Sequence, residues 1–211
     1  MFITERKTIL AYIAKICKSD RRLIIAVAGP PAAGKSTLAE RLVDDLNSTE
    51  RGRAALVPMD GFHLDNAQLD KMGLRHRKGA PETFDAVGFV KLVSQISEKQ
   101  SEIYYPTFDR TVDAVIPEAQ ALSLETQIVV IEGNYLLINE QPWSNVIPFL
   151  DLTIFVRPNL ETLKERLIER WREHGFGENA ALDKAMGNDI PNALYVLEKS
   201  KAADLEFKTN A

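Results

Sequence analysis

Four short apolar runs are spaced along the chain, and each is continuous rather than alternating in polarity. They cover residues 23–28, 54–57, 128–131 and 152–156. Continuous aliphatic runs of this length are typical of strands that are buried on both faces of a parallel sheet. The first run ends at Gly29-Pro30-Pro31, which predicts a loop, and we expect a helix to begin near Lys35 and Ser36.

Segments with helical periodicity lie between these runs. Apolar residues recur at helical spacing in residues 38–46, 87–96 and 160–173, and in an amphipathic segment within residues 1–20. Strands that alternate with helices predict an α/β fold, with a doubly wound and mostly parallel sheet flanked by helices. Ligands of such sheets bind beyond the carboxyl ends of the strands, so the residues that follow each strand are the first candidates for function.

No repeat, low-complexity tract or Gly/Ser linker divides the chain, so we expect a single domain over residues 1–211. Residues 61–83 and 104–124 depart from the alternating pattern. Both segments follow strand ends, where a substrate is expected to bind, and the second is expected to form a short ribbon. We interpret them as insertions on the substrate side of the sheet.

Composition and charge limit the partners of this domain. The formal charge of −4 provides no general positive field for a nucleic-acid backbone, so no nucleic-acid partner is expected. Cys17 is the only cysteine, which excludes an internal disulfide and fits a reducing cytoplasm. No apolar run approaches the roughly 18 residues of a membrane span, and the first twenty residues lack a signal-peptide block. We therefore expect a cytoplasmic protein without a membrane partner; a homodimer is one assembly that the sequence allows.

The loop after the first predicted strand carries the most specific motif. Gly29-Pro30-Pro31-Ala32-Ala33-Gly34-Lys35-Ser36 matches G-x-x-x-x-G-K-[ST] between a predicted strand and a predicted helix. The glycines let backbone N–H groups converge on phosphate oxygens, and Lys35 can reach the β and γ phosphates. Ser36 can ligate Mg²⁺, with Thr37 beside it as support. The alternative is a glycine turn that joins a strand to a helix and binds nothing.

Further motifs follow this loop in order. They are Pro58-Met59-Asp60-Gly61-Phe62-His63-Leu64, Ala80-Pro81-Glu82-Thr83-Phe84-Asp85, Tyr105-Pro106-Thr107-Phe108-Asp109-Arg110, Ile131-Glu132-Gly133-Asn134, and an arginine-bearing helix from Leu163. Together these motifs resemble the uridine kinase, phosphoribulokinase and pantothenate kinase family over nearly the whole chain. The most similar branch contains nucleoside-kinase-like proteins, some labelled fructose transport system kinases. The resemblance implies a kinase that uses ATP and Mg²⁺ to phosphorylate a hydroxyl group of a small molecule, such as a sugar.

Two carboxylates at strand ends are candidates for the chemistry. Asp60 follows the second strand and matches the aspartate that the family uses as catalytic base, where it would accept the proton of the attacking hydroxyl. Its alternative role is that of a solvated Asp-Gly turn residue. Glu132 ends the third strand, the usual place of a Walker B acid that holds Mg²⁺ directly or through water. The alternative is a charged residue that only marks the end of the strand.

The candidates for binding the acceptor are His63, Asp85, Phe108 and Arg110. Asp85 resembles the aspartate that binds ribose hydroxyls in uridine kinases, and it could equally be the N-cap of the helix that begins near residue 86. His63 could contact the substrate or Asp60, or form a local hydrogen bond.

Near Phe108 the sequence departs from uridine kinases, which carry a second aromatic residue and a histidine where this chain has Arg110 and Asp113. Arg110 could bind an anionic or polyhydroxylated acceptor, or form a surface salt bridge with Asp109 or Asp113. Recognition of a pyrimidine is therefore in doubt.

The helix after residue 156 resembles a kinase lid, which we place at residues 159–188. Arg166 and Arg170 are four residues apart and share one face, from which they could neutralise charge on the transferring phosphoryl group. The same helix carries acids at positions 161, 165, 169 and 173, so the alternative is an exposed helix laced with ion pairs. Beyond it, residues 188–192 could cap the final helix, and Asn192 could lie near the adenine, as a comparable segment does in relatives.

A second functional class is a nucleotide-dependent switch or chaperone-like ATPase built on the same loop. The chain lacks an Asn-Lys-x-Asp guanine motif, which argues against a GTPase switch. The two insertions argue for an acceptor pocket. The leading hypothesis is therefore phosphoryl transfer to a sugar, with a nucleoside or a pantothenate-like alcohol as alternative acceptors.

Overall fold

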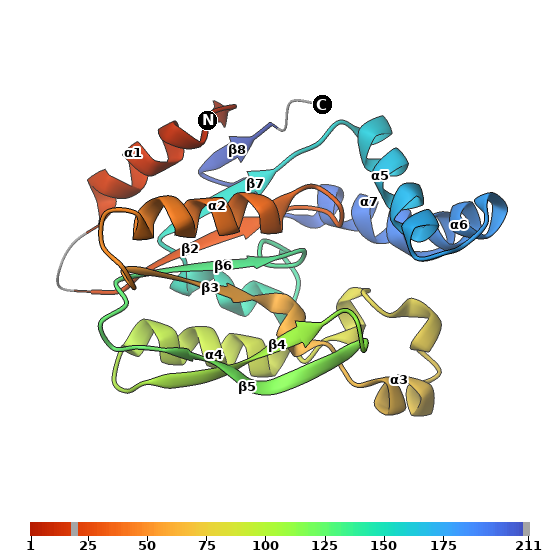
Figure 1. The fold of residues 1–211 in the computed structure, drawn as a ribbon, viewed down its shortest axis with the longest axis horizontal. Helices are drawn as coiled ribbons and strands as arrows, with labels where there is room; N and C mark the ends of the chain where they lie inside the picture. Colours follow the sequence, from red (N-terminus) through yellow and green to blue (C-terminus); the bar gives the residue numbers. More distant parts are fainter. Residues whose placement is uncertain (18–20, 209–211) are drawn as a thin grey trace.

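The computed structural model describes residues 1–17 and 21–208 and contains a six-stranded parallel sheet (Figure 1). Across the sheet the strands run in the order β1 (Phe2–Ile3), β8 (Leu205–Phe207), β7 (Leu152–Val156), β2 (Leu23–Ala28), β6 (Ile128–Gly133) and β3 (Ala54–Pro58). Every neighbouring pair is parallel. The four strands predicted from apolar runs are confirmed, and so is the α/β class with a parallel sheet.

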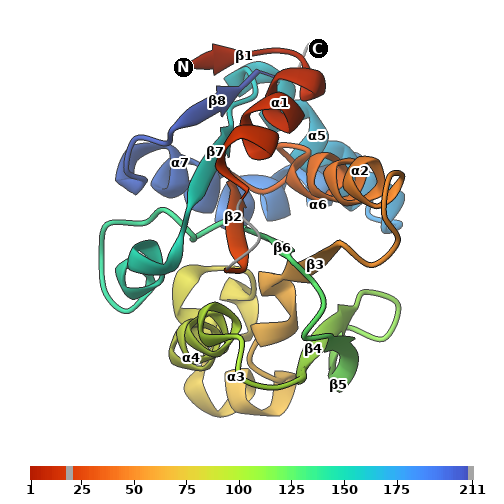
Figure 2. The same ribbon diagram turned by 90° about the vertical axis from the view of Figure 1, so that its left-hand side faces the viewer.

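Helices cover both faces of the sheet and give three layers (Figure 2). On one face lie α1 (Arg6–Ile16) and α2 (Lys35–Asn47), whose buried side chains pack with one side of the central strands. On the other face lies α4 (Ala86–Glu98) with a 3-10 turn at Trp143–Phe149. Each helix buries residues at three- and four-residue intervals, which is the pattern of a helix with one apolar face.

The first segment differs from the helix expected within residues 1–20. Residues 2 and 3 form β1 at the edge of the sheet, and the helix spans only Arg6–Ile16. Residues 18–20 lie outside the described part of the chain. None of the helices in the described part is both long and apolar enough to cross a membrane.

The two insertions form separate pieces at one end of the sheet. Residues 61–83 contain α3 (Asn66–Met72) and short 3-10 turns. The expected ribbon is an antiparallel hairpin of β4 (Ile103–Asp109) and β5 (Ala114–Leu122). Gly61 lies directly against the backbone carbonyl of Pro106 in β4, so a side chain at position 61 would collide with the hairpin. This close approach holds the hairpin against the turn that carries Asp60.

The chain after β7 forms α5 (Leu160–Glu173), α6 (Glu178–Lys184), a π turn (Ala185–Asp189) and α7 (Ile190–Lys199). The expectation that residues 188–192 cap the final helix is wrong, because α7 continues directly from the π turn and no side chain caps it. The Asp189 side chain is bound instead to Arg170 and Trp171 of α5. A small cluster of Leu163, Leu167, Ile190 and neighbours packs against Ala32 and so joins this region to the loop after β2.

Candidate functional site

The loop between β2 and α2 has the backbone of a phosphate-binding loop. Gly34, at the N-cap of α2, has a φ of 91°, and Ala32 has a φ of 61°. Gly29 approaches β7 so closely that an added Cβ would lie 2.5 Å from the carbonyl oxygen of Val156. The two glycines are therefore required by the path of the loop, and residues 29–34 lead directly into the amino end of α2, where a phosphate is favoured.

Lys35 and Ser36 begin α2 and face the end of β6. The Lys35 ammonium is buried and donates to the Pro30 carbonyl oxygen at 3.0 Å, which leaves two of its three N–H groups for another acceptor. The Ser36 hydroxyl donates to Glu132 Oε1 at 3.2 Å. Thr37 is exposed on the first turn of the helix.

Glu132 stands between the loop and Asp60 because of strand register. It pairs with Val27 of β2 on one side and with Pro58 of β3 on the other. Burial raises the pKa of the Glu132 carboxyl, and the Lys35 charge opposes this shift. Burial likewise lowers the pKa of Lys35, and the Glu132 and Asp60 carboxylates oppose that shift.

The site has oxygen atoms that suit Mg²⁺ rather than a transition metal. In the described residues no cluster of three or more His, Cys, Asp or Glu side chains could hold a metal ion. A magnesium site in a nucleotide-binding protein needs only one or two protein oxygens, since the phosphates supply others. The adjacent Ser36 hydroxyl and Glu132 carboxylate fit that requirement.

Asp60 follows β3 in a 3-10 turn and is bound by the hairpin. Arg110, just beyond β4, donates from Nη2 to Asp60 Oδ2 at 3.1 Å. The surface salt bridge considered for Arg110 with Asp109 or Asp113 is not formed. Asp109 accepts hydrogen bonds from Thr111, and Asp113 is bound by Lys78 and Asn66.

His63 lies in an aromatic stack next to Asp60. Its ring is centred 4.0 Å from the Phe84 ring and 4.6 Å from the Phe108 ring, and its Nδ1 lies 2.9 Å from the Asp60 carbonyl oxygen. Burial lowers the pKa of His63, although the Asp60 charge opposes this shift. The structure therefore contains the local hydrogen bond expected as one alternative for His63, between its ring and the Asp60 backbone.

Asp85 is the N-cap of α4, since its Oδ1 accepts the Gly88 N–H at 2.8 Å. The capping alternative is therefore confirmed. The carboxylate is also exposed, so it remains open to a ligand.

Lys78 is a site residue that our sequence analysis missed. Its ammonium donates to Asn66 Oδ1 and Asp113 Oδ1, both at 2.7 Å, and it lies 5.0 Å from the centre of the Phe108 ring. It thereby joins the 61–83 insertion to the tip of the hairpin. The basic run from Arg75 to Lys78 was the available signal, but its partners are distant in sequence.

The arginines of α5 have different surroundings. Arg170 donates to Asp189 at 3.0 Å, and Arg172 is paired with the exposed acids Glu169 and Glu178. Arg166 makes no ion pair with any described residue. Burial is the main cause of the lowered pKa of Lys35, and the charges of Arg110 and Arg170 add to it, so both cations lie within electrostatic reach of this lysine.

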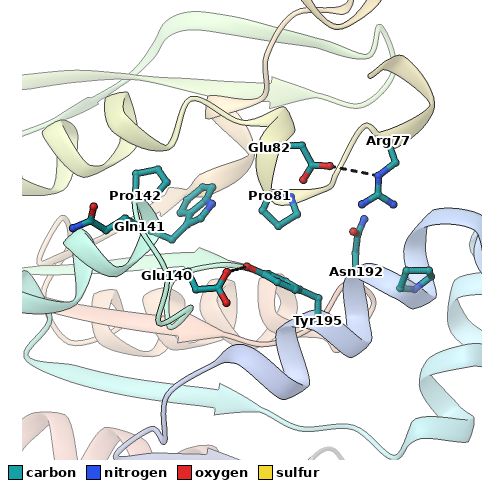
Figure 3. Close-up of a pocket in the computed structure, with 10 residues that line it drawn as sticks. Arg77, Pro81, Glu82, Glu140, Gln141, Pro142, Asn192 and Tyr195 are labelled. Carbon is teal, nitrogen blue, oxygen red and sulfur yellow. Dashed lines mark hydrogen bonds and ion pairs between the residues drawn. The ribbon is translucent and has the colours of Figure 1, made fainter. Parts of the chain in front are cut away.

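Asn192 is buried in the first turn of α7, and its expected place near the adenine stays a prediction. It lines a cavity of about 420 Å³ whose other walls are residues 77, 81 and 82, residues 140–143, and Pro191 and Tyr195 of α7 (Figure 3). None of the lining residues belongs to residues 29–37. Asn188, one turn earlier, donates to the Lys78 carbonyl oxygen at 2.9 Å, so the π turn is joined to the 61–83 segment.

Comparisons with known proteins agree with this geometry. Residues 24–209 match the sequence profile described as the phosphoribulokinase / uridine kinase family. The chain is 35% identical over 189 residues to the uncharacterized protein YggC of Escherichia coli strain K12, covering 88% of this chain and 77% of that protein. It is 29% identical over 201 residues to a Schizosaccharomyces pombe protein that carries the provisional name uridine kinase, covering 90% of this chain and 85% of that protein.

Among solved structures, a similar one is that of a protein from Silicibacter sp. TM1040 with the provisional name fructose transport system kinase. The two folds superpose with a TM-score of 0.91 at 36% identity, over 97% of this chain and 100% of that chain.

Proposed function

Because the chain belongs to the phosphoribulokinase / uridine kinase family of P-loop kinases, we propose that it transfers the γ-phosphoryl group of Mg-ATP to a hydroxyl group of a small molecule. The observation that carries this proposal is the convergence of Lys35, Glu132 and Asp60 at the carboxyl ends of three adjacent strands. A phosphate-binding cation, a metal ligand and a base are the protein groups that phosphoryl transfer requires.

The nucleotide binds at the loop after β2. Backbone N–H groups of residues 29–34 and the remaining Lys35 donors hold the phosphates, aided by the amino end of α2. Ser36 and Glu132 would hold Mg²⁺, which when bound neutralises charge on the phosphate oxygens.

Asp60 is the proposed base. Its carboxylate accepts the proton of the acceptor hydroxyl and orients that oxygen toward the γ-phosphate. The Arg110 contact holds the carboxylate in place from the hairpin. Arg166 and Arg170 then stabilise the charge of the transferring group, since guanidinium groups suit phosphate oxygens.

The proposed acceptor lies near His63, Asp85, Phe108 and Arg110. A carboxylate and a guanidinium group suit a molecule with several hydroxyls, and His63 and Lys78 already contact the Phe108 ring, which leaves less of it for a nucleobase. The name of the similar Silicibacter protein makes fructose the first sugar to test. Nucleosides and pantothenate-like alcohols are the alternative acceptors.

A screen of ATP consumption tests this proposal. Purified protein is incubated with Mg-ATP and a panel of sugars, nucleosides and pantothenate, and ADP release is measured for the wild type and for Asp60→Asn. We expect acceptor-dependent ADP release that Asp60→Asn lowers by about a hundredfold or more, as for other acid–base groups. The matched control is Asp70→Asn, at an exposed aspartate of the 61–83 insertion whose partner is Arg75.

Three outcomes would contradict parts of the proposal. Turnover that Asp60→Asn leaves unchanged would reject Asp60 as the base. If no acceptor of the panel raises ADP release above the rate without acceptor, a nucleotide-dependent switch or ATPase is favoured. Folded protein that binds neither ATP nor GTP in calorimetry with Mg²⁺ would reject the enzyme altogether.

A further inference from the structure

A buried carboxylate outside the proposed chemistry holds one of the lid arginines. Asp189 Oδ2 accepts hydrogen bonds from Arg170 Nη2 at 3.0 Å and from Trp171 Nε1 at 2.6 Å. The Asp189 side chain is 8% exposed, whereas that of Arg170 is 35% exposed. The Asp189 carboxylate is therefore inside the protein, and the Arg170 guanidinium that it binds lies partly at the surface.

The π turn explains how Asp189 reaches α5. Residues 185–189 form a single π turn between α6 and α7, with helical backbone on both sides. A π turn adds one residue to the helical repeat and so redirects the side chains around it, and such turns are frequent at functional sites. Burial of an unpaired carboxylate is strongly unfavourable, so Asp189 depends on both of its partners.

The bond to Asp189 leaves most of the Arg170 guanidinium available. Of its five N–H donors, only a donor on Nη2 is bound to another described residue. The packing of Ala32 against the Leu163 cluster fixes α5, which carries Arg170, next to the phosphate loop. Burial is the main cause of the lowered pKa of Lys35 and the Arg170 charge adds to it, so Arg170 lies within electrostatic reach of that lysine.

The neighbouring arginines lack this support. Arg172 pairs with Glu169 and Glu178, whose side chains are 57% and 81% exposed, and such surface pairs hold a side chain weakly. Arg166 has no acidic partner among the described residues. Of the three arginines, only Arg170 is fixed by a buried acid.

We propose that Asp189 is a positioning residue that, with Trp171, orients the Arg170 guanidinium toward the phosphate loop so that it meets the transferring phosphoryl group. This inference rests on the proposed kinase function. Asp189 itself contacts neither nucleotide nor acceptor, and it acts only through Arg170. Its removal should therefore slow the transfer step without weakening the binding of nucleotide.

A double-mutant cycle tests the proposal. The four proteins are the wild type, Asp189→Asn, Arg170→Ala and the double variant, measured with the best acceptor from the screen. We expect Asp189→Asn to lower kcat by about ten- to a hundredfold, the range for a displaced catalytic group, and to change the KM for ATP by less than about threefold. In the Arg170→Ala background the same substitution should change kcat by less than about twofold.

The controls separate positioning from folding. Asp183→Asn makes the same change on exposed α6 and should leave kcat at the wild-type value. Calorimetry should show that Asp189→Asn binds ADP with the wild-type affinity. A variant whose lid had lost its fold would bind ADP more weakly. If Asp189→Asn does not fold, Asp189→Glu retains the buried charge and takes its place in the cycle, with the same coupling to Arg170 expected.

The outcomes are distinct for the two proposals. A wild type without acceptor-dependent turnover removes the kinase function on which the inference rests. If the wild type is active and Asp189→Asn has the same kcat, the positioning role alone is overturned. An equal loss of kcat in both backgrounds also overturns it, because Asp189 would then act independently of Arg170.

Discussion

Lys35, at the start of α2, and Glu132, at the end of β6, are both buried at the site. Each would be costly to bury alone, and each charge makes the burial of the other less unfavourable. Phosphates and a metal ion arriving at the same place would bring further charges of both signs. The proposed reaction therefore uses groups whose charges the fold already holds close together.

His63 gives a prediction about pH at the same scale. Its pKa in the folded protein is below the ordinary value of 6.5, because its ring is buried between Phe84 and Phe108. Just below pH 6.5 the unfolded chain therefore binds a proton that the folded chain does not. The free energy of unfolding should be fully retained above pH 6.5 and should fall as the pH decreases below it, by at most about 1.4 kcal/mol per pH unit.

Chemical denaturation at pH 7.5, 6.5 and 5.5 measures this effect. His63→Gln should remove the additional pH dependence, whereas His76→Gln, at an exposed histidine, should keep it. If the free energy of unfolding falls equally with decreasing pH in the wild type and in His63→Gln, His63 does not cause the loss of stability.

The site residues differ in how far the sequence predicts them. Lys35 and Ser36 follow from a local motif, since the loop, strand and helix are contiguous. The Arg110–Asp60 bond joins residues 50 positions apart and depends on how the hairpin packs against Gly61. No local pattern contains that information, so the two acids considered for a surface salt bridge with Arg110 were the wrong ones.

At the scale of elements, the length of the apolar run decides which predictions succeed. The strands β7, β2 and β6 lie inside the sheet and β3 lies at one edge, and each of the four has a continuous apolar run, which made it recognisable. The edge strand β1 and its neighbour β8 are only two and three residues long, too short for any periodicity to appear. The cap expected for the final helix failed because the π turn keeps the helical backbone continuous and directs Asp189 to α5.

Asp85 allows the two roles of one side chain to be separated. Asp85→Ala removes the cap of α4 and should lower the free energy of unfolding by about 0.5–2 kcal/mol. Asp85→Asn keeps an oxygen that can accept the Gly88 N–H and should retain the stability. If the charge also binds acceptor hydroxyls, Asp85→Asn should raise the acceptor KM by about tenfold or more, since hydrogen bonds to a charged group are strong.

Thermal or chemical denaturation and steady-state kinetics on the same two variants measure both effects. A wild-type acceptor KM for Asp85→Asn would leave Asp85 with the capping role alone.

At the scale of the whole molecule, the end of the sheet away from the site is held by Arg22. Its buried guanidinium donates to the carbonyl oxygens of Ile96, Ser123 and Thr126, which joins the start of β2 to the end of α4 and to the segment after the hairpin. Burial also lowers the pKa of Arg22. One side chain thus connects three segments that are distant in sequence.

Arg22→Met should lower the free energy of unfolding by about 2–4 kcal/mol, because three buried carbonyl groups lose a charged donor. Arg21→Met is the matched control: the Arg21 side chain is 59% exposed in a pair with Asp151, and its loss should cost less than about 1 kcal/mol. ATP affinity, measured by calorimetry on both variants, should stay at the wild-type value. A stability equal to that of the Arg21 variant would contradict the bracing role of Arg22.

The position of β8 in the sheet affects how the protein assembles during synthesis. Among the strands of the described residues β8 is last in sequence, yet it lies between β1 and β7. The strand β1 thus has no hydrogen-bonding neighbour in the sheet until β8 has left the ribosome. We therefore expect nascent chains that stop before residue 205 to hold a folded centre while their amino-terminal edge remains sensitive to proteases.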